Sequence, residues 1–135
     1  MRRDQLEHAI RNACQIIGKP EVIVVGSQSI LGTFREDQLP TDATMSVEID
    51  IIPIADDNAE TAAPDGEPQY TGWCLDKEDL CVAKLCAFRE KDRNFVAALV
   101  RSALGARKTI LTRLSSVDER YLPAAEVAAS WLRSL

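Results

Sequence analysis

Two acidic residues, Glu48 and Asp50, lie two positions apart within residues 47–54, a run that predicts a β-strand. Because successive side chains of a strand point to opposite faces, both carboxylates would share one face, about 7 Å apart at their Cα atoms. Mg²⁺ commonly takes one or two carboxylates and leaves its other positions to water and phosphate oxygens. The pair is therefore a candidate metal site and catalytic centre, and a solvent-facing pair without chemistry is the alternative.

A second candidate element stands before this strand. Residues 21–25 are a β-branched run typical of a buried strand, and Gly26 and Ser27 end it ahead of a possible short helix over residues 28–32. A glycine lets a phosphate approach the backbone, a helix N-terminus offers unpaired N–H groups, and Ser27 adds a hydroxyl. Many strands end in such turns, but a phosphate cradle followed by two acids suits metal-dependent phosphoryl transfer.

The order Gly26-Ser27 and then Glu48-x-Asp50 resembles the signature of the nucleotidyltransferase superfamily. Residues 79–92, which read Asp-Leu-Cys-Val-Ala-Lys-Leu-Cys-Ala-Phe-Arg-Glu-Lys-Asp, resemble a helical stretch of a bacterial nucleotidyltransferase-like family, a distant relative of abortive-infection toxins. The resemblance covers residues 21–54 and 72–100. It implies a nucleotidyltransferase-type fold and the transfer of a nucleotide from a nucleoside triphosphate, with Mg²⁺, to an RNA or protein acceptor.

The same resemblance implies roles for four residues of the helical stretch. Lys84 would contact the phosphates, and Arg89, Lys91 and Asp92 would lie beside the site. The alternative for these four is a charged helix surface with local ion pairs.

The sequence departs from the superfamily pattern in its centre. That pattern usually adds a third carboxylate on a later strand, whereas residues 55–72 are short, rich in acids and loop-like. This shortening motivates a second hypothesis, a catalytically degenerate module that binds a partner. A sheet that lacks a strand has an open edge, which could pair with a second copy or with another protein.

The predicted helices and strands that position these residues indicate one α+β domain over residues 1–135, with a small mixed sheet packed on helices. Residues 1–54 would contain a helix over 4–17 and the two core strands. An acidic loop would follow over residues 55–72, and residues 73–135 would form a helical half. The helices expected there cover 76–104 with a break near 89–92, 108–114 and 118–135. Residues 33–46 read as a loop. Two strands do not make a stable sheet, so a third must come from residues 36–45, from residues 68–74 or from a partner chain.

Composition limits the remaining possibilities. The net charge is −5, but residues 84–113 carry eight basic and two acidic residues, a local charge of +6 that suits an anionic ligand. No apolar run is long enough to span a bilayer, and no signal core follows the N-terminus, so we expect no membrane and a cytoplasmic location. The four cysteines are expected to be free thiols.

Overall fold

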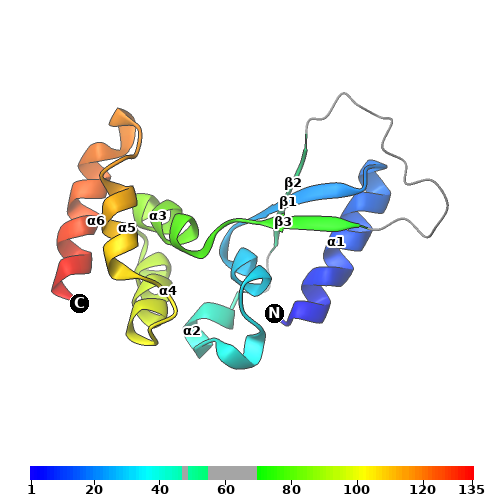
Figure 1. Cartoon of the computed structure of the whole chain (residues 1–135), viewed down its shortest axis with the longest axis horizontal. Helices are drawn as coiled ribbons and strands as arrows, with labels where there is room; N and C mark the ends of the chain where they lie inside the picture. Colours follow the sequence, from blue (N-terminus) through cyan, green and yellow to red (C-terminus); the bar gives the residue numbers. More distant parts are fainter. Residues whose placement is uncertain (47–48, 55–69) are drawn as a thin grey trace.

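The computed structural model describes residues 1–46, 49–54 and 70–135, and it is a mixed α+β structure (Figure 1). The first part holds helix α1, strand β1, a short 3-10 helix η1, two brief helical turns and strand β2; strand β3 and a group of helices follow. The bounds are α1 Arg3–Ile17, β1 Glu21–Val25, η1 Ser27–Gly32, η2 Glu36–Gln38, α2 Thr41–Thr44, β2 Asp50–Pro53, β3 Thr71–Cys74, α3 Lys77–Ala87, α4 Glu90–Arg101, α5 Arg107–Leu114, η3 Glu119–Tyr121 and α6 Leu122–Ser134.

The described strands form a three-stranded sheet in the order β2-β1-β3. The central strand β1 pairs antiparallel with β2, where Val25 lies opposite Asp50, and parallel with β3, where Ile23 lies opposite Trp73. The third strand thus comes from this chain, at the second of the three positions that the sequence allowed. The sheet confirms the small mixed sheet that the sequence predicts, without specifying a nucleotidyltransferase fold.

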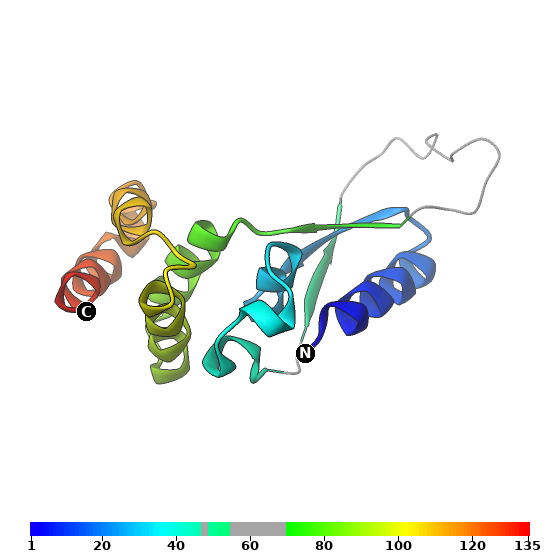
Figure 2. The same cartoon turned by 60° about the horizontal axis from the view of Figure 1, so that its bottom comes forward.

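The helices that contact the sheet cover one of its faces. Val22 and Val24 of β1 are fully buried on that face, toward α1 and η1, while Ile23 and Val25 point the other way. Figure 2 shows α1 and η1 on the same side of the strands. One-sided packing is common where strands pair antiparallel, as β1 and β2 do. The opposite face of the sheet is not covered by any described element.

The helical half packs on the sheet half through a continuous apolar core. Leu80 and Leu85 of α3, Leu99 of α4 and Leu132 of α6 belong to the same buried cluster as Val24 of β1. Helix α3 contacts η1, and α2 contacts α4, so the two halves meet at two places. Their apolar surfaces are removed from water together, which couples the position of α3 to that of the sheet.

Several sequence boundaries were wrong. The predicted loop over residues 33–46 contains η2 and α2, and the predicted acidic loop and helical half overlap β3, which begins at Thr71. The strand predicted over residues 47–54 is described only from Asp50 to Pro53, and residues 47–48 lie outside the described part. The break between α3 and α4 is confirmed and falls at Phe88 and Arg89. All four cysteines are free thiols; Cys14 and Cys81 are buried, whereas Cys74 and Cys86 are only partly buried.

Gly72 offers a test of how tightly α1 packs on the sheet. A Cβ atom at this position would lie 2.3 Å from Cδ1 of Ile10, closer than atoms can approach. We expect Gly72→Ala to lower the free energy of unfolding by about 1–3 kcal/mol through overpacking. Urea unfolding followed by circular dichroism measures this change in the free energy of unfolding. The exposed neighbour provides the control: Thr71→Ala should change stability by about 0.5 kcal/mol or less, and equal effects of the two would contradict the close approach.

Candidate functional site

The end of strand β1 brings a glycine backbone and a carboxylate together. Gly26 has φ 80° and ψ −174°, a conformation that is essentially restricted to glycine. A Cβ atom there would lie 2.6 Å from Oδ2 of Asp50, so the carboxylate lies directly beside the Gly26 backbone. This placement follows from the sheet, because the first residue of β2 pairs with Val25 at the last position of β1. The sequence predicted that the Gly-Ser corner and an acid of the next strand would share one location.

Asp50 has the properties of an available metal ligand. Its side chain is exposed, and within the described residues it has no hydrogen bond or ion pair. Ser27 begins η1 next to Gly26, and its hydroxyl likewise has no partner among the described residues. One free carboxylate beside an accessible backbone is compatible with Mg²⁺, which can bind through one carboxylate together with water and phosphate oxygens. The other predicted ligand, Glu48, lies outside the described residues.

The backbone around the corner is held by two internal contacts. The carbonyl of Gly26 accepts hydrogen bonds from the backbone N–H of Ser29 at 3.1 Å and from its hydroxyl at 2.7 Å. The buried amide of Gln28 donates to the carbonyl of Ser46 at 2.8 Å, which ties η1 to the segment that leads to β2. The Oε1 atom of Gln28 is the one buried side-chain oxygen without a partner in the described part of the chain. Sequence reasoning missed Gln28, because a glutamine between two serines gives no signal of this contact.

The predicted phosphate ligands of the helical stretch form a separate cluster. Asp92 is fully buried where α3 meets α4, and its carboxylate accepts hydrogen bonds from the backbone N–H of Arg89 at 3.1 Å and from Nε at 2.7 Å. Nζ of Lys84 lies 3.5 Å from the same carboxylate and 4.6 Å from the ring centroid of Phe95. The two Lys84 contacts join α3 to α4, whereas the Arg89 hydrogen bonds cap the first turn of α4. None of these contacts reaches Gly26, Ser27 or Asp50.

The electrostatics of this cluster match an internal ion-pair network. Burial raises the pKa of Asp92, but the hydrogen bonds from Arg89 and the charge of Lys84 outweigh it, so the pKa lies below its ordinary value. Burial lowers the pKa of Lys84, although the Asp92 carboxylate opposes that shift. Lys91 is exposed on the first turn of α4. The structure therefore groups Lys84, Arg89 and Asp92 by ion pairs, as in the alternative, but Asp92 and most of Lys84 are buried and do not form a charged helix surface. Lys91 lies outside these pairs.

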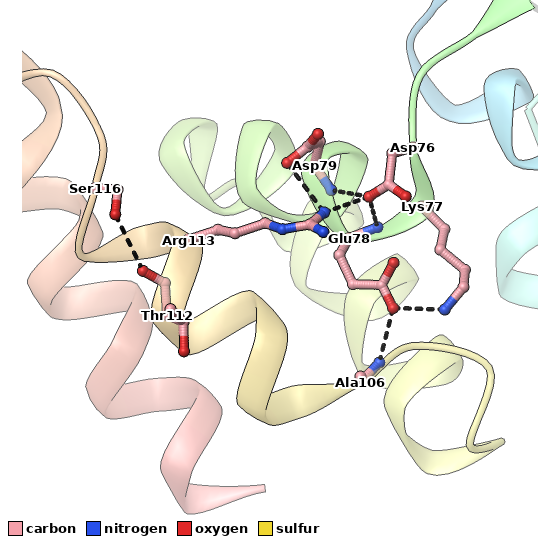
Figure 3. Close-up of polar contacts among 8 residues, drawn as sticks. All are labelled: Asp76, Lys77, Glu78, Asp79, Ala106, Thr112, Arg113 and Ser116. Atoms are coloured by element: carbon pink, nitrogen blue, oxygen red, sulfur yellow. Dashed lines mark hydrogen bonds and ion pairs between the residues drawn. The ribbon is translucent and has the colours of Figure 1, made fainter.

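A second polar cluster fixes the N-terminus of α3 (Figure 3). Asp76 caps the helix by accepting from the N–H groups of Glu78 and Asp79, and it pairs with Arg113 of α5. The buried carboxylate of Glu78 accepts from the N–H of Ala106, directly before α5, at 3.4 Å. The helix was predicted to begin at Asp76, but the contacts with α5 were not predicted, because they join residues about 30 positions apart. These contacts orient α3 and leave little free charge for a ligand.

Comparisons with protein-family models, with curated proteins and with solved structures found no match for this chain. In the described residues there is no group of three or more His, Cys, Asp or Glu side chains that could hold a metal ion. No helix among these residues has both the length and the apolar character needed to cross a bilayer. The Gly26 corner places the exposed Asp50 carboxylate beside a backbone that has no side chain.

Replacement of Asp92 tests the α3–α4 network. Because the folded pKa of Asp92 lies below its unfolded value, its stabilisation is present above the unfolded pKa and is lost as the pH falls through the folded pKa. We expect Asp92→Asn to lower the free energy of unfolding by about 3 kcal/mol at neutral pH, the low end for a buried pair. The low end applies because Arg89 remains largely exposed to water.

Urea titrations across the acid range measure this effect. The difference between the variant and the unmodified chain should begin to shrink below about pH 4, where the carboxylate of the unfolded chain becomes protonated, and should go on shrinking as the pH falls through the lower folded pKa. The control is Asp37→Asn, which removes an exposed pair with Arg35 and should cost about 0.5 kcal/mol or less. A difference between Asp92→Asn and the unmodified chain that stays constant down to about pH 2 would contradict the assignment.

Proposed function

We propose that the chain is a Mg²⁺-dependent nucleotidyltransferase whose site lies at the end of β1. The observation that carries this proposal is the Asp50 carboxylate, exposed and unpaired among the described residues, directly beside the Gly26 backbone. The absence of a side chain at Gly26 lets a polyphosphate approach the main chain, and Ser27 can donate its hydroxyl to a phosphate oxygen. Asp50 can take one position in the shell of a divalent cation.

Most of the protein's part in such a reaction is positioning and charge neutralisation. When bound, Mg²⁺ would neutralise phosphate charge and hold the reacting oxygens in place. Gly26 and Ser27 would hold the triphosphate, and Asp50, with Glu48 as its predicted partner, would hold the metal. The rigid corner supports this role, because Ser29 locks the Gly26 carbonyl and β-sheet pairing fixes Asp50 opposite Val25.

The helical stretch has a different role in this proposal. Lys84 pairs with Asp92 and thereby holds α3 against α4, while Arg89 pairs with Asp92 at the start of α4. In this proposal none of the three is a direct phosphate ligand. Lys91 is exposed and lacks an ion pair within the described part of the chain, so it is the member of this stretch that is free to meet an anionic substrate or an RNA acceptor. The acceptor in this proposal is either an RNA end or a protein hydroxyl, and labelled transfer distinguishes them.

Nucleotide binding tests the proposal directly. Each nucleoside triphosphate is titrated into the chain with and without MgCl₂ by calorimetry, and transfer of labelled nucleotide to RNA and protein acceptors is then measured. We expect Mg²⁺-dependent binding that Asp50→Asn weakens by about tenfold or more, equivalent to about 1.4 kcal/mol. The matched control is Asp42→Asn, an exposed acid on α2. The proposal fails if no nucleotide binds at millimolar concentration, or if both variants bind like the unmodified chain.

A second candidate function, a degenerate module that forms a homodimer, is favoured by the uncovered face of the sheet. Ile52, Ile23 and Trp73 lie opposite one another in the register, so they form an apolar row across all three strands. Ile52 is 47% exposed and Trp73 is 57% exposed. A continuous apolar row of this kind on a folded surface commonly marks a contact with another protein. A second copy would bring an identical row, which satisfies the symmetry of a two-fold dimer.

The oligomeric state of the chain tests this second candidate. Sedimentation equilibrium should give a dimer for the unmodified chain, and the double substitution Ile52→Ser and Trp73→Ser should give a monomer with unchanged helix content. The exposed control Val127→Ser, on α6, should leave the dimer intact. At about 100 μM, a dimer with a micromolar Kd would form. A monomeric mass for the unmodified chain at that concentration would exclude the homodimer.

A further inference from the structure

A groove separates helix α1 from the free edge of strand β3. It has a volume of about 710 Å³, and its walls come from α1 on one side and β3 on the other, with the end of η1 between them. The residues that define its chemistry are Arg3, Glu7, Arg11, Tyr70, Gly72 and Cys74. The groove is distinct from the Gly26 corner, because it borders β3, whereas Asp50 lies on β2 at the other edge of the sheet.

The β3 side of the groove presents backbone groups that no described strand pairs. The N–H of Thr71 donates to the Pro20 carbonyl at 2.8 Å, and the N–H of Leu75 donates to the Val24 carbonyl at 3.3 Å. Because N–H and C=O groups alternate sides along a strand, those of Gly72 and Cys74 point away from β1, toward the free edge. An edge strand with unpaired groups is a template for another extended chain.

The α1 side of the groove carries the charge. Arg3, Glu7 and Arg11 are spaced four residues apart, so they follow one another along one face of the helix. Nε of Arg3 donates to the Leu31 carbonyl at 2.9 Å, which holds this side chain at the groove. Arg11 is exposed and has no ion pair in the part of the chain that the structure describes. Two arginines and one glutamate give the wall a net positive charge.

We infer that this groove binds an extended acidic peptide segment of a partner protein, which adds to β3 as a fourth strand. The peptide backbone would pair with the N–H and C=O groups of Gly72 and Cys74, as in strand-addition recognition. Alternate side chains of the added strand would point into the groove, where carboxylates meet Arg3 and Arg11. This inference depends neither on nucleotidyl transfer nor on the dimer, because it uses a different edge and different residues.

Two synthetic peptides test both the pairing and the charge. One fluorescein-labelled octapeptide alternates threonine and glutamate, and the other alternates threonine and lysine. Fluorescence polarisation should show saturable binding of the glutamate peptide and none of the lysine peptide. Arg11→Glu should weaken binding of the glutamate peptide by about fivefold or more, since it reverses the charge facing the peptide. The matched control Arg107→Glu makes the same change on α5, at an exposed position far along the chain, and should leave binding unchanged.

Amide hydrogen exchange distinguishes strand addition from loose attraction between charges. The amides of Gly72 and Cys74 should become protected when the glutamate peptide binds, because they gain hydrogen-bond partners. The inference is overturned if the glutamate peptide does not bind at millimolar concentration, if it binds without protecting these two amides, or if Arg107→Glu weakens binding as much as Arg11→Glu. Each of these results is independent of whether the chain binds a nucleoside triphosphate.

Discussion

The central strand β1 constrains the rest of the sheet half. It is the one described strand with a partner on both sides, and its Val22 and Val24 are fully buried. At its end, the backbone conformation of Gly26 turns the chain into η1, and pairing with β2 sets Asp50 beside that turn. A side chain at Gly26 would both strain the backbone and displace the carboxylate. The position of the Asp50 carboxylate therefore depends on the absence of a side chain at Gly26.

The second constraint lies in the helical half and involves charge. Phe88 adopts a left-handed conformation at the end of α3, which is uncommon for a residue other than glycine, and the chain reverses there into α4. The reversal directs Asp92 back toward Lys84 and Arg89, where their hydrogen bonds compensate for its burial. A buried carboxylate without such partners would destabilise the fold. The stability of the fold is therefore a sufficient reason for the charged residues of this stretch, without a ligand.

The parts of the fold that sequence patterns predicted are those with strong local signals. The amphipathic period of α1, the β-branched run of β1 and the Asp76 cap are all properties of neighbouring residues. Strand β3 could be offered only as one of three choices, because four residues that include Gly72 carry a weak pattern and depend on pairing with β1. Helix α2 was missed for a similar reason, since its four residues are too few for a periodic signal. The Lys84 contacts depend on the turn at Phe88, which the sequence indicated only as a break.

The same distinction separates the two kinds of site. The position of a residue such as Asp50 can be predicted from its spacing and strand context, because a sheet places the ends of neighbouring strands at known positions. The groove beside β3 has no sequence motif, since it arises from the distance between α1 and an edge strand that sequence patterns offered only as one of three choices. A sheet covered on one face by described elements has unsatisfied backbone at its edges and apolar side chains on its other face. Such edges and faces are the places where a sheet can pair with or pack on another protein.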